Sequence, residues 1–148
     1  MRASAAVGFL VVLAAGVGPG RTDPPVGVVK VVKGEALVQR AGQSLPARDG
    51  MGLAEGDLLR TGPDGRLGVL LRDDTRLSLG PDSEIRIDRF AFAPAQGNLA
   101  LVLRMLRGAA TYVSGKLAKL SPEAVRVETP VGIVGIRGTQ FAARIEAP

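Results

Sequence analysis

The sequence contains no cysteine and no histidine, and aromatic residues make up only 3% of its 148 residues. Without cysteine and histidine, the chain cannot form disulfides, thiolate nucleophiles, Ser-His-Asp triads or the zinc and haem sites that need these ligands. The few aromatic rings also argue against a base-stacking surface for nucleic acid, although the pI is about 10.4. We therefore expect a protein that is not an enzyme, needs no metal or cofactor and does not bind nucleic acid.

Glycine and proline are abundant, with 20 and 10 residues respectively. Both destabilise the interior of a long helix, so their spread along the chain favours short strands joined by turns. Apolar and polar residues alternate with a period of two over residues 66–72, 76–79, 84–88 and 125–128, a pattern typical of half-buried strands. The sequence predicts an all-β fold, with short strands wound as a β-roll, a short β-solenoid or a sandwich.

The same alternation predicts the core, because every second residue of a strand points to the same face. The expected core residues are Leu67, Val69, Leu71, Leu77, Leu79, Ile85, Ile87, Val125, Val127 and Phe141. Residues 99–106 are compatible with a helix or a strand, and the β-prone residues after them favour a strand. Residues 115–123 predict one surface turn of helix, and residues 41–57 a loop with brief extended pieces. Residues 27–32 and 35–39 predict an opening pair of strands around Lys33-Gly34.

The first 20 residues have the three parts of a secretory signal: Arg2, an apolar run and a small-residue exit. The apolar run is shorter than a spanning helix needs, which favours cleavage, although an uncleaved anchor and a buried helix remain alternatives. We expect a signal peptide at residues 1–20, an all-β domain at residues 21–148, no further transmembrane span, and a periplasmic or secreted protein.

Candidate catalytic groups have simpler interpretations. Several carboxylates lie at predicted turns or beside arginines, where hydrogen bonds within the turn or ion pairs explain them. They are Asp73, Asp74, Asp82, Glu84 and Asp88. Gly132, Gly135 and Gly138 do not have the spacing of a dinucleotide loop. The serines have no histidine base, which leaves only a Ser114 and Lys116 dyad as a remote candidate. An enzyme acting on envelope polysaccharide would need two acidic residues facing each other across a cleft.

Four arginines suggest a binding face. Alternation places them opposite the core leucines on successive strands, where adjacent strands would align them into a basic stripe: Arg66, Arg72, Arg76 and Arg86. Such a stripe predicts binding to an anionic envelope polymer or an envelope protein, weakened by salt. A plain solvated surface is the alternative.

The last part of the chain carries spaced motifs. Residues 127–130 read VETP and residues 134–141 read VGIRGTQF. Earlier motifs precede them in the chain: Gly56-Asp57, residues 60–62 (RTG) and residues 71–77 (LRDDTRL). Together these motifs resemble the FecR-domain family over residues 28–145. Asp74 stands where the family usually has glycine. The signature positions are Thr129, Pro130, Arg137, Gly138, Thr139 and Phe141.

The resemblance implies an all-β, largely periplasmic domain without known catalysis. The best-described members are transmembrane regulators that relay a receptor's state to a cytoplasmic sigma factor. Because only about 20 residues precede the expected mature body, we expect an exported binding or scaffold module instead, with a regulatory role in envelope signalling as the alternative. We expect the signature glycines to permit backbone bends, Arg137 to cap carbonyls or pair with a turn carboxylate, and Phe141 to close an open end of the core. A ligand-contact role for Arg137 is the alternative.

Overall fold

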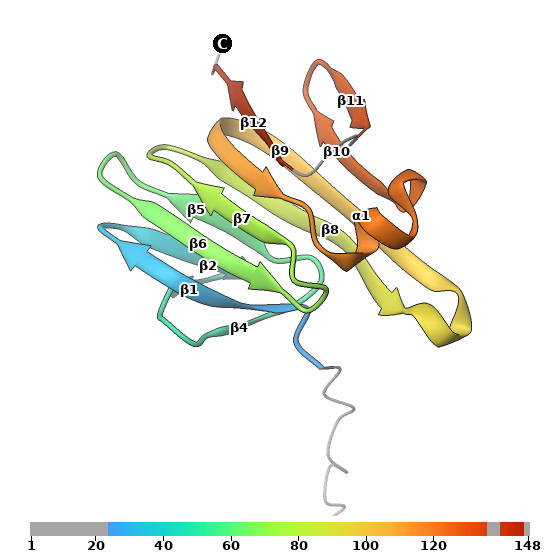
Figure 1. Ribbon diagram of the computed structural model, residues 1–148. Coiled ribbons are helices and arrows are strands. Elements are labelled where there is room, and N and C mark those ends of the chain that lie inside the picture. The colour runs from blue at the N-terminus through green and yellow to red at the C-terminus, as the bar shows by residue number, and fades with distance from the viewer. Residues whose placement is uncertain (1–23, 136–139, 147–148) are drawn as a thin grey trace, which may run out of the picture.

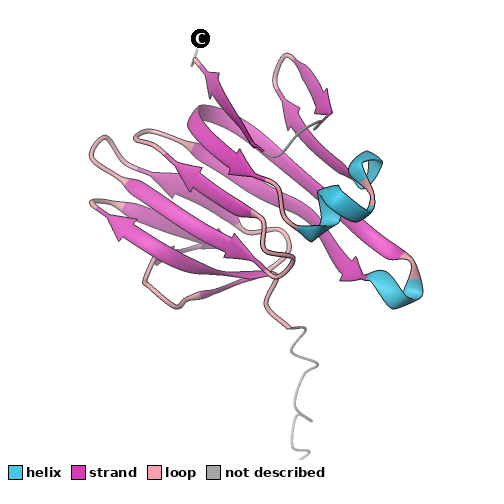
Figure 2. Ribbon diagram, viewed as in Figure 1, coloured by secondary structure: helices cyan, strands magenta, loops and turns pink. Residues whose placement is uncertain are grey.

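The computed structural model describes residues 24–135 and 140–146, and within them the regular secondary structure is mostly strand (Figures 1 and 2). The twelve strands belong to one curled sheet. They are β1 (Gly27–Lys33), β2 (Ala36–Arg40), β3 (Gln43–Pro46), β4 (Gly52–Leu53), β5 (Leu58–Thr61), β6 (Arg66–Leu71), β7 (Arg76–Leu79), β8 (Glu84–Ala93), β9 (Asn98–Val113), β10 (Val125–Thr129), β11 (Gly132–Gly135) and β12 (Gln140–Ile145). The all-β prediction is confirmed.

The long strand β9 joins the two halves of the sheet. Its first part pairs with β8 and, in parallel, with β10, whereas its last residues pair with β7 and β12. We call the half that contains β1, β4, β6, β7 and β12 half-sheet A, and the half that contains β2, β3, β5, β8, β10 and β11 half-sheet B. Every other pairing is antiparallel, which identifies a curled sheet rather than a solenoid of parallel coils.

The expected pairing of the first two strands is wrong. β1 and β2 form where predicted, but β1 pairs with β6 and β4, whereas β2 pairs with β5 and β3. The connection through Gly34, whose φ is 61°, crosses from half-sheet A to half-sheet B instead of folding back as a hairpin. Val29 and Val38, both at 0% exposure, thereby belong to one shared core from different half-sheets.

The core lies between the two half-sheets. The nine aliphatic residues predicted for it are all buried, and Phe141 is partly buried and packs against them. The core is extended by β9, through Leu101, Leu103, Met105 and Tyr112, and by Leu117 of the short helix. The alternation in the sequence therefore identifies the buried face of each strand correctly.

Helix is confined to short pieces. The segment predicted as one turn forms α1 (Lys116–Leu120), followed by the 3-10 turn η2 (Pro122–Ala124), and another 3-10 turn, η1 (Pro94–Gln96), links β8 to β9. Residues 99–106 are strand, as predicted, and β3 and β4 are the brief extended pieces of residues 41–57. Among the residues that the structure describes, no helix is long and apolar enough to cross a membrane.

Candidate functional site

The motif carboxylate Asp57 is a buried structural link. It is 1% exposed and accepts hydrogen bonds from Arg40 Nε at 2.9 Å and from the Ala54 amide at 2.8 Å. A terminal guanidinium nitrogen of Arg40 also donates to Asp57 at 2.7 Å and to the Gly52 carbonyl at 3.0 Å. The hydrogen bond that Arg40 donates to Asp57 raises the pKa of the Arg40 guanidinium. Asp57 therefore joins the β4–β5 turn to β2.

Thr61 and Ser83 link the neighbouring turns in the same way. The Thr61 hydroxyl donates to the Gly80 carbonyl at 2.6 Å and accepts from the Ser83 amide at 2.9 Å. The Ser83 hydroxyl donates to the Ala109 carbonyl at 3.0 Å and accepts from the Ala109 amide at 2.9 Å. These bonds hold the start of β8 against the bend of β9.

Asp73 organises the turn between β6 and β7. It is fully buried, and its carboxylate accepts from the Thr75 amide at 3.1 Å, the Thr75 hydroxyl at 2.7 Å and the Leu117 amide at 3.1 Å. Asp74, at φ 71°, is exposed and pairs with Lys116. The turn interpretation of these two acids fits the geometry, and within the described ranges no three His, Cys, Asp or Glu residues are grouped to hold a metal.

The signature region forms a hairpin and a core contact. The Thr129 hydroxyl donates to the Gly132 carbonyl at 2.9 Å and accepts from the Val131 amide at 3.3 Å, so Thr129 and the exposed Pro130 shape the β10–β11 turn. Phe141 on β12 packs against Tyr112, with ring centroids 5.1 Å apart. Arg137, Gly138 and Thr139 lie outside the described residues, so the predictions for them stay predictions.

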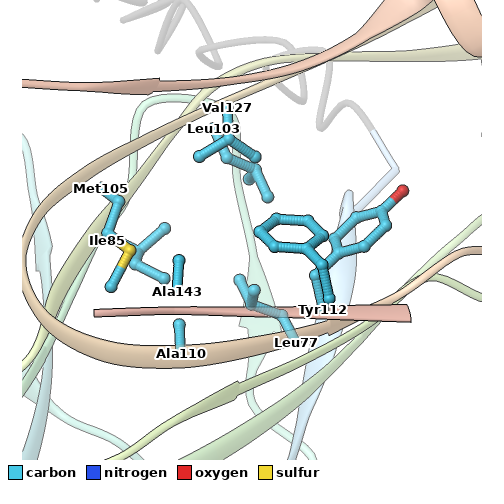
Figure 3. Close-up of a pocket in the computed structure, with 9 residues that line it drawn as sticks. Leu77, Ile85, Leu103, Met105, Ala110, Tyr112, Val127 and Ala143 are labelled. Atoms are coloured by element: carbon cyan, nitrogen blue, oxygen red, sulfur yellow. The ribbon is translucent and has the colours of Figure 1, made fainter. Parts of the chain in front are cut away.

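A small apolar cavity lies beside this aromatic pair. It is lined by residues of β7, β8, β9, β10 and β12, including Leu103, Tyr112 and Val127 (Figure 3). Its volume is about 10 Å³, no larger than one water molecule needs. The cavity is a packing gap and not a ligand site.

Half-sheet B pairs most of its outward arginines with carboxylates. Its outer ion pairs link Arg60 and Arg107 to Glu84, Arg86 and Arg104 to Asp88, and Arg104 and Arg126 to Glu128. The hydrogen bond that Arg104 donates to Glu128, followed by the charge of Asp88, raises the pKa of Arg104. On this surface three carboxylates are therefore shared among five arginines, and the exposed Arg89 on β8 makes no ion pair among the described residues.

Half-sheet A has no such compensation. Its strands contain lysine and arginine but no aspartate or glutamate. Alternation directs four of these cations away from the core, and we call them the basic face: Lys33, Arg66, Arg76 and Arg144. None of the four makes an ion pair in the part of the chain that the structure describes. Lys30, exposed at a bulge in β1, adds to the same half-sheet.

The structure brings together only part of the predicted stripe. Arg66 and Arg76 lie on the neighbouring strands β6 and β7. Arg86 lies on β8 in half-sheet B and is paired with Asp88. Arg72 follows the end of β6 and lies over the Phe90 ring, 5.4 Å from its centroid. The reason is that β8 is separated from β7 by β9, so successive strands in sequence are not neighbours in the sheet.

Sequence reasoning missed Lys33 and Arg144 as members of this face. Arg144 alternates with Phe141, Ala143 and Ile145, which pack against the core, so its outward direction was readable from the sequence. Which residues lie beside Arg144 could not be predicted from the sequence, because that depends on the pairing of β12 with the end of β9.

The comparison with family models decides the identity of the domain. Residues 57–148, more than half of the chain, match the model described as FecR protein. The chain belongs to the FecR family. No curated protein and no solved structure matches it. The FecR match begins at Asp57 and includes the buried links at Thr61, Asp73 and Ser83, so these motif residues serve the fold of the FecR domain. FecR domains are typically periplasmic parts of the cell envelope.

Proposed function

We propose that this FecR-family chain is an exported, non-catalytic binding module of the cell envelope that holds an anionic envelope polymer or protein against its basic face. The observation that carries this proposal is the difference between the two outer surfaces. Most arginines on half-sheet B are ion-paired with carboxylates, whereas Lys33, Arg66, Arg76 and Arg144 on half-sheet A make no ion pair among the described residues.

The basic face carries a local repulsion that a partner would relieve. Lys33 lies directly opposite Arg66 in the β1–β6 ladder. Like charges at directly opposite positions of a sheet are destabilising, by roughly 0.2–1 kcal/mol. An anion bound between them would replace this repulsion with attraction. Clustered cations that make no ion pair among the described residues also attract anionic partners to the surface, and salt weakens this attraction.

The described carboxylates support a non-catalytic role. Asp57 and Asp73 are engaged in the buried links, and the acids of half-sheet B are ion-paired. Two open hollows each contain two acids, Glu35 with Asp82 and Asp82 with Glu146. All three of these residues are exposed, whereas a general acid of a glycosidase is held in an apolar pocket.

The test compares two triple variants that remove the same charges. Lys33→Gln/Arg66→Gln/Arg76→Gln changes the basic face. Lys119→Gln/Arg48→Gln/Arg89→Gln changes one lysine and two arginines that are also exposed and without ion pairs among the described residues, but lie outside that face. The mature protein and both variants are sedimented with an isolated envelope fraction across a salt series. Thermal unfolding checks that all three are folded.

We expect the wild type and the control triple to sediment with the envelope at low salt. We expect the basic-face triple to stay in solution, and wild-type retention to fall as the Debye length shrinks from about 10 Å at 0.1 M to about 3 Å at 1 M. Equal retention of the two triples would overturn the assignment of the face. New reducing ends in purified envelope polysaccharide, absent with the basic-face triple, would overturn the non-catalytic role.

A further inference from the structure

A shallow hollow divides the basic face. Arg66 on β6 and Arg144 on β12 line a hollow of about 360 Å³. Between them lie β7 and the last part of β9. Small residues line the floor, among them Gly80, directly after β7, and Ala109 of β9. With β7 and β9 between them, Arg66 and Arg144 have backbones separated by about three strand spacings, or roughly 14 Å. Two extended arginine side chains reach across such a distance to one shared group.

The floor also presents hydroxyl groups. Ser78 and Thr111 lie directly opposite each other in the β7–β9 ladder, and both line the hollow. They are outward-facing, because their neighbours Leu77 and Tyr112 are in the core. The hollow therefore combines fork-shaped cationic donors at two ends with hydroxyls that donate and accept between them.

The charge of the hollow is not balanced from within. Neither arginine makes an ion pair in the described ranges, and no acid lines the hollow. Asp82 and Glu146 share the adjoining hollow with Arg144 from its other side. They moderate the positive potential at Arg144 without occupying the space between the two arginines.

These features select among anionic partners. Guanidinium forks bind carboxylates bidentately, and hydroxyls at the floor match the hydroxyls of a sugar ring. The small floor residues leave room for a ring to approach the sheet. Resting on the binding role proposed above, we propose that this hollow is a subsite for a carboxylate-bearing sugar of an anionic glycan chain. Arg66 and Arg144 hold the carboxylate, and Ser78 and Thr111 contact the sugar hydroxyls.

The experiment uses polygalacturonate as the carboxylate glycan, with polyphosphate and phosphatidylglycerol vesicles as other anions and dextran as the neutral glycan. Binding is measured by calorimetry or by sedimentation for wild type, for Arg66→Lys/Arg144→Lys and for Ser78→Ala/Thr111→Val. The lysine pair keeps the charge of the basic face but removes the bidentate fork. The second pair keeps the charge and removes only the hydroxyls.

We expect wild type to bind polygalacturonate and not dextran. We expect the lysine pair to bind polygalacturonate about tenfold more weakly, because lysine lacks the bidentate fork, and to lose less affinity for polyphosphate, whose high charge density provides a diffuse attraction that lysine keeps. The hydroxyl pair should lose affinity several-fold for polygalacturonate alone. As an internal check, Glu146→Gln should strengthen binding slightly by removing a nearby negative charge.

The subsite would be overturned if the lysine pair or the hydroxyl pair bound polygalacturonate as tightly as wild type does. It would also be overturned if wild type bound polyphosphate or vesicles more tightly than polygalacturonate. Each of them leaves the basic face intact as a binding surface. Failure of the basic face itself would show differently, as equal envelope retention of the two matched triple variants.

Discussion

Asp73 is a fully buried acid with three hydrogen-bond donors around it and no cation paired with it in the described chain. Both of its oxygens accept hydrogen bonds. The donors come from Thr75 in the same turn and from Leu117 at the start of α1, so one side chain holds the turn and the helix together. Its neighbour Asp74 is exposed and has only a surface ion pair.

Replacing Asp73 with asparagine should therefore lower the free energy of unfolding by about 2 kcal/mol. The amide turns one acceptor into a donor that faces another donor in a buried site. Asp74→Asn is the matched control, and it should cost well under about 1 kcal/mol because exposed ion pairs contribute little. Urea denaturation of the two variants measures the difference. Equal losses would show that Asp73 does not hold this turn.

Tyr112 is the single tyrosine of a chain without tryptophan. It is 1% exposed, and burial raises the pKa of its hydroxyl above the ordinary value. The unfolded chain ionises near pH 10, before the folded one does. The contribution of Tyr112 to stability is therefore complete below about pH 10 and is lost as the pH rises through the folded pKa.

Tyrosinate absorbance should titrate at a higher pH in the native protein than in urea-denatured protein, and no other chromophore obscures it. Tyr112→Phe should weaken the loss of stability at alkaline pH while it leaves the neutral-pH fold in place. A native midpoint at or below the denatured one would contradict the burial of this hydroxyl.

At the scale of elements, β9 decides the architecture because it belongs to both half-sheets. Its direction changes at Gly108, which has φ 86°. A Cβ at this position would lie 2.2 Å from the Ser83 hydroxyl oxygen and 2.6 Å from the Asp82 carbonyl oxygen. The bend therefore needs glycine both for its left-handed backbone and for the close approach of the turn between β7 and β8.

Gly108→Ala should destabilise the protein by about 2–5 kcal/mol, from the backbone conformation and the overpacking together. Gly97→Ala is the matched control: Gly97 has φ 67° in the β8–β9 connection, but nothing lies within 4 Å of its added Cβ. The control should show only the backbone cost, about 1–2 kcal/mol. Thermal unfolding compares the two, and similar losses would argue against close contact at the bend.

At the scale of the whole molecule, the two half-sheets separate different kinds of surface. One outer surface is covered by ion pairs, and the other carries the basic face. The interior between them is closed by apolar residues from every major strand. This separation lets one outer surface carry unpaired cations without disturbing the core.

The proposed role also requires export. We expect the protein to be found in the envelope or outside the cell, with its mature N-terminus between about Ala15 and Asp23. Arg2, the apolar run and the small-residue exit form the pattern that a signal peptidase recognises. Mass spectrometry of the fractionated protein measures the N-terminus. A product that begins at Met1 and remains in the cytosol would contradict export.

The sequence by itself determined the local features of the domain. Strand positions, the buried face of each strand and the short helix follow from period-two alternation and from glycine and proline at the turns, which are properties of neighbouring residues. The motifs between Asp57 and Phe141 determined the family. The outward direction of Arg66, Arg76 and Arg144 likewise follows from alternation with their neighbours in the sequence.

Only the tertiary structure decided which strands are neighbours. β1 pairs with β6 rather than β2, and β9 lies between β7 and β8. Through these pairings Arg86 lies on half-sheet B, where it is paired with Asp88, and Arg144 lines the same hollow as Arg66. The physical reason is that alternation specifies which face of a strand is buried but not its partner. The partner depends on how distant strands close one common core.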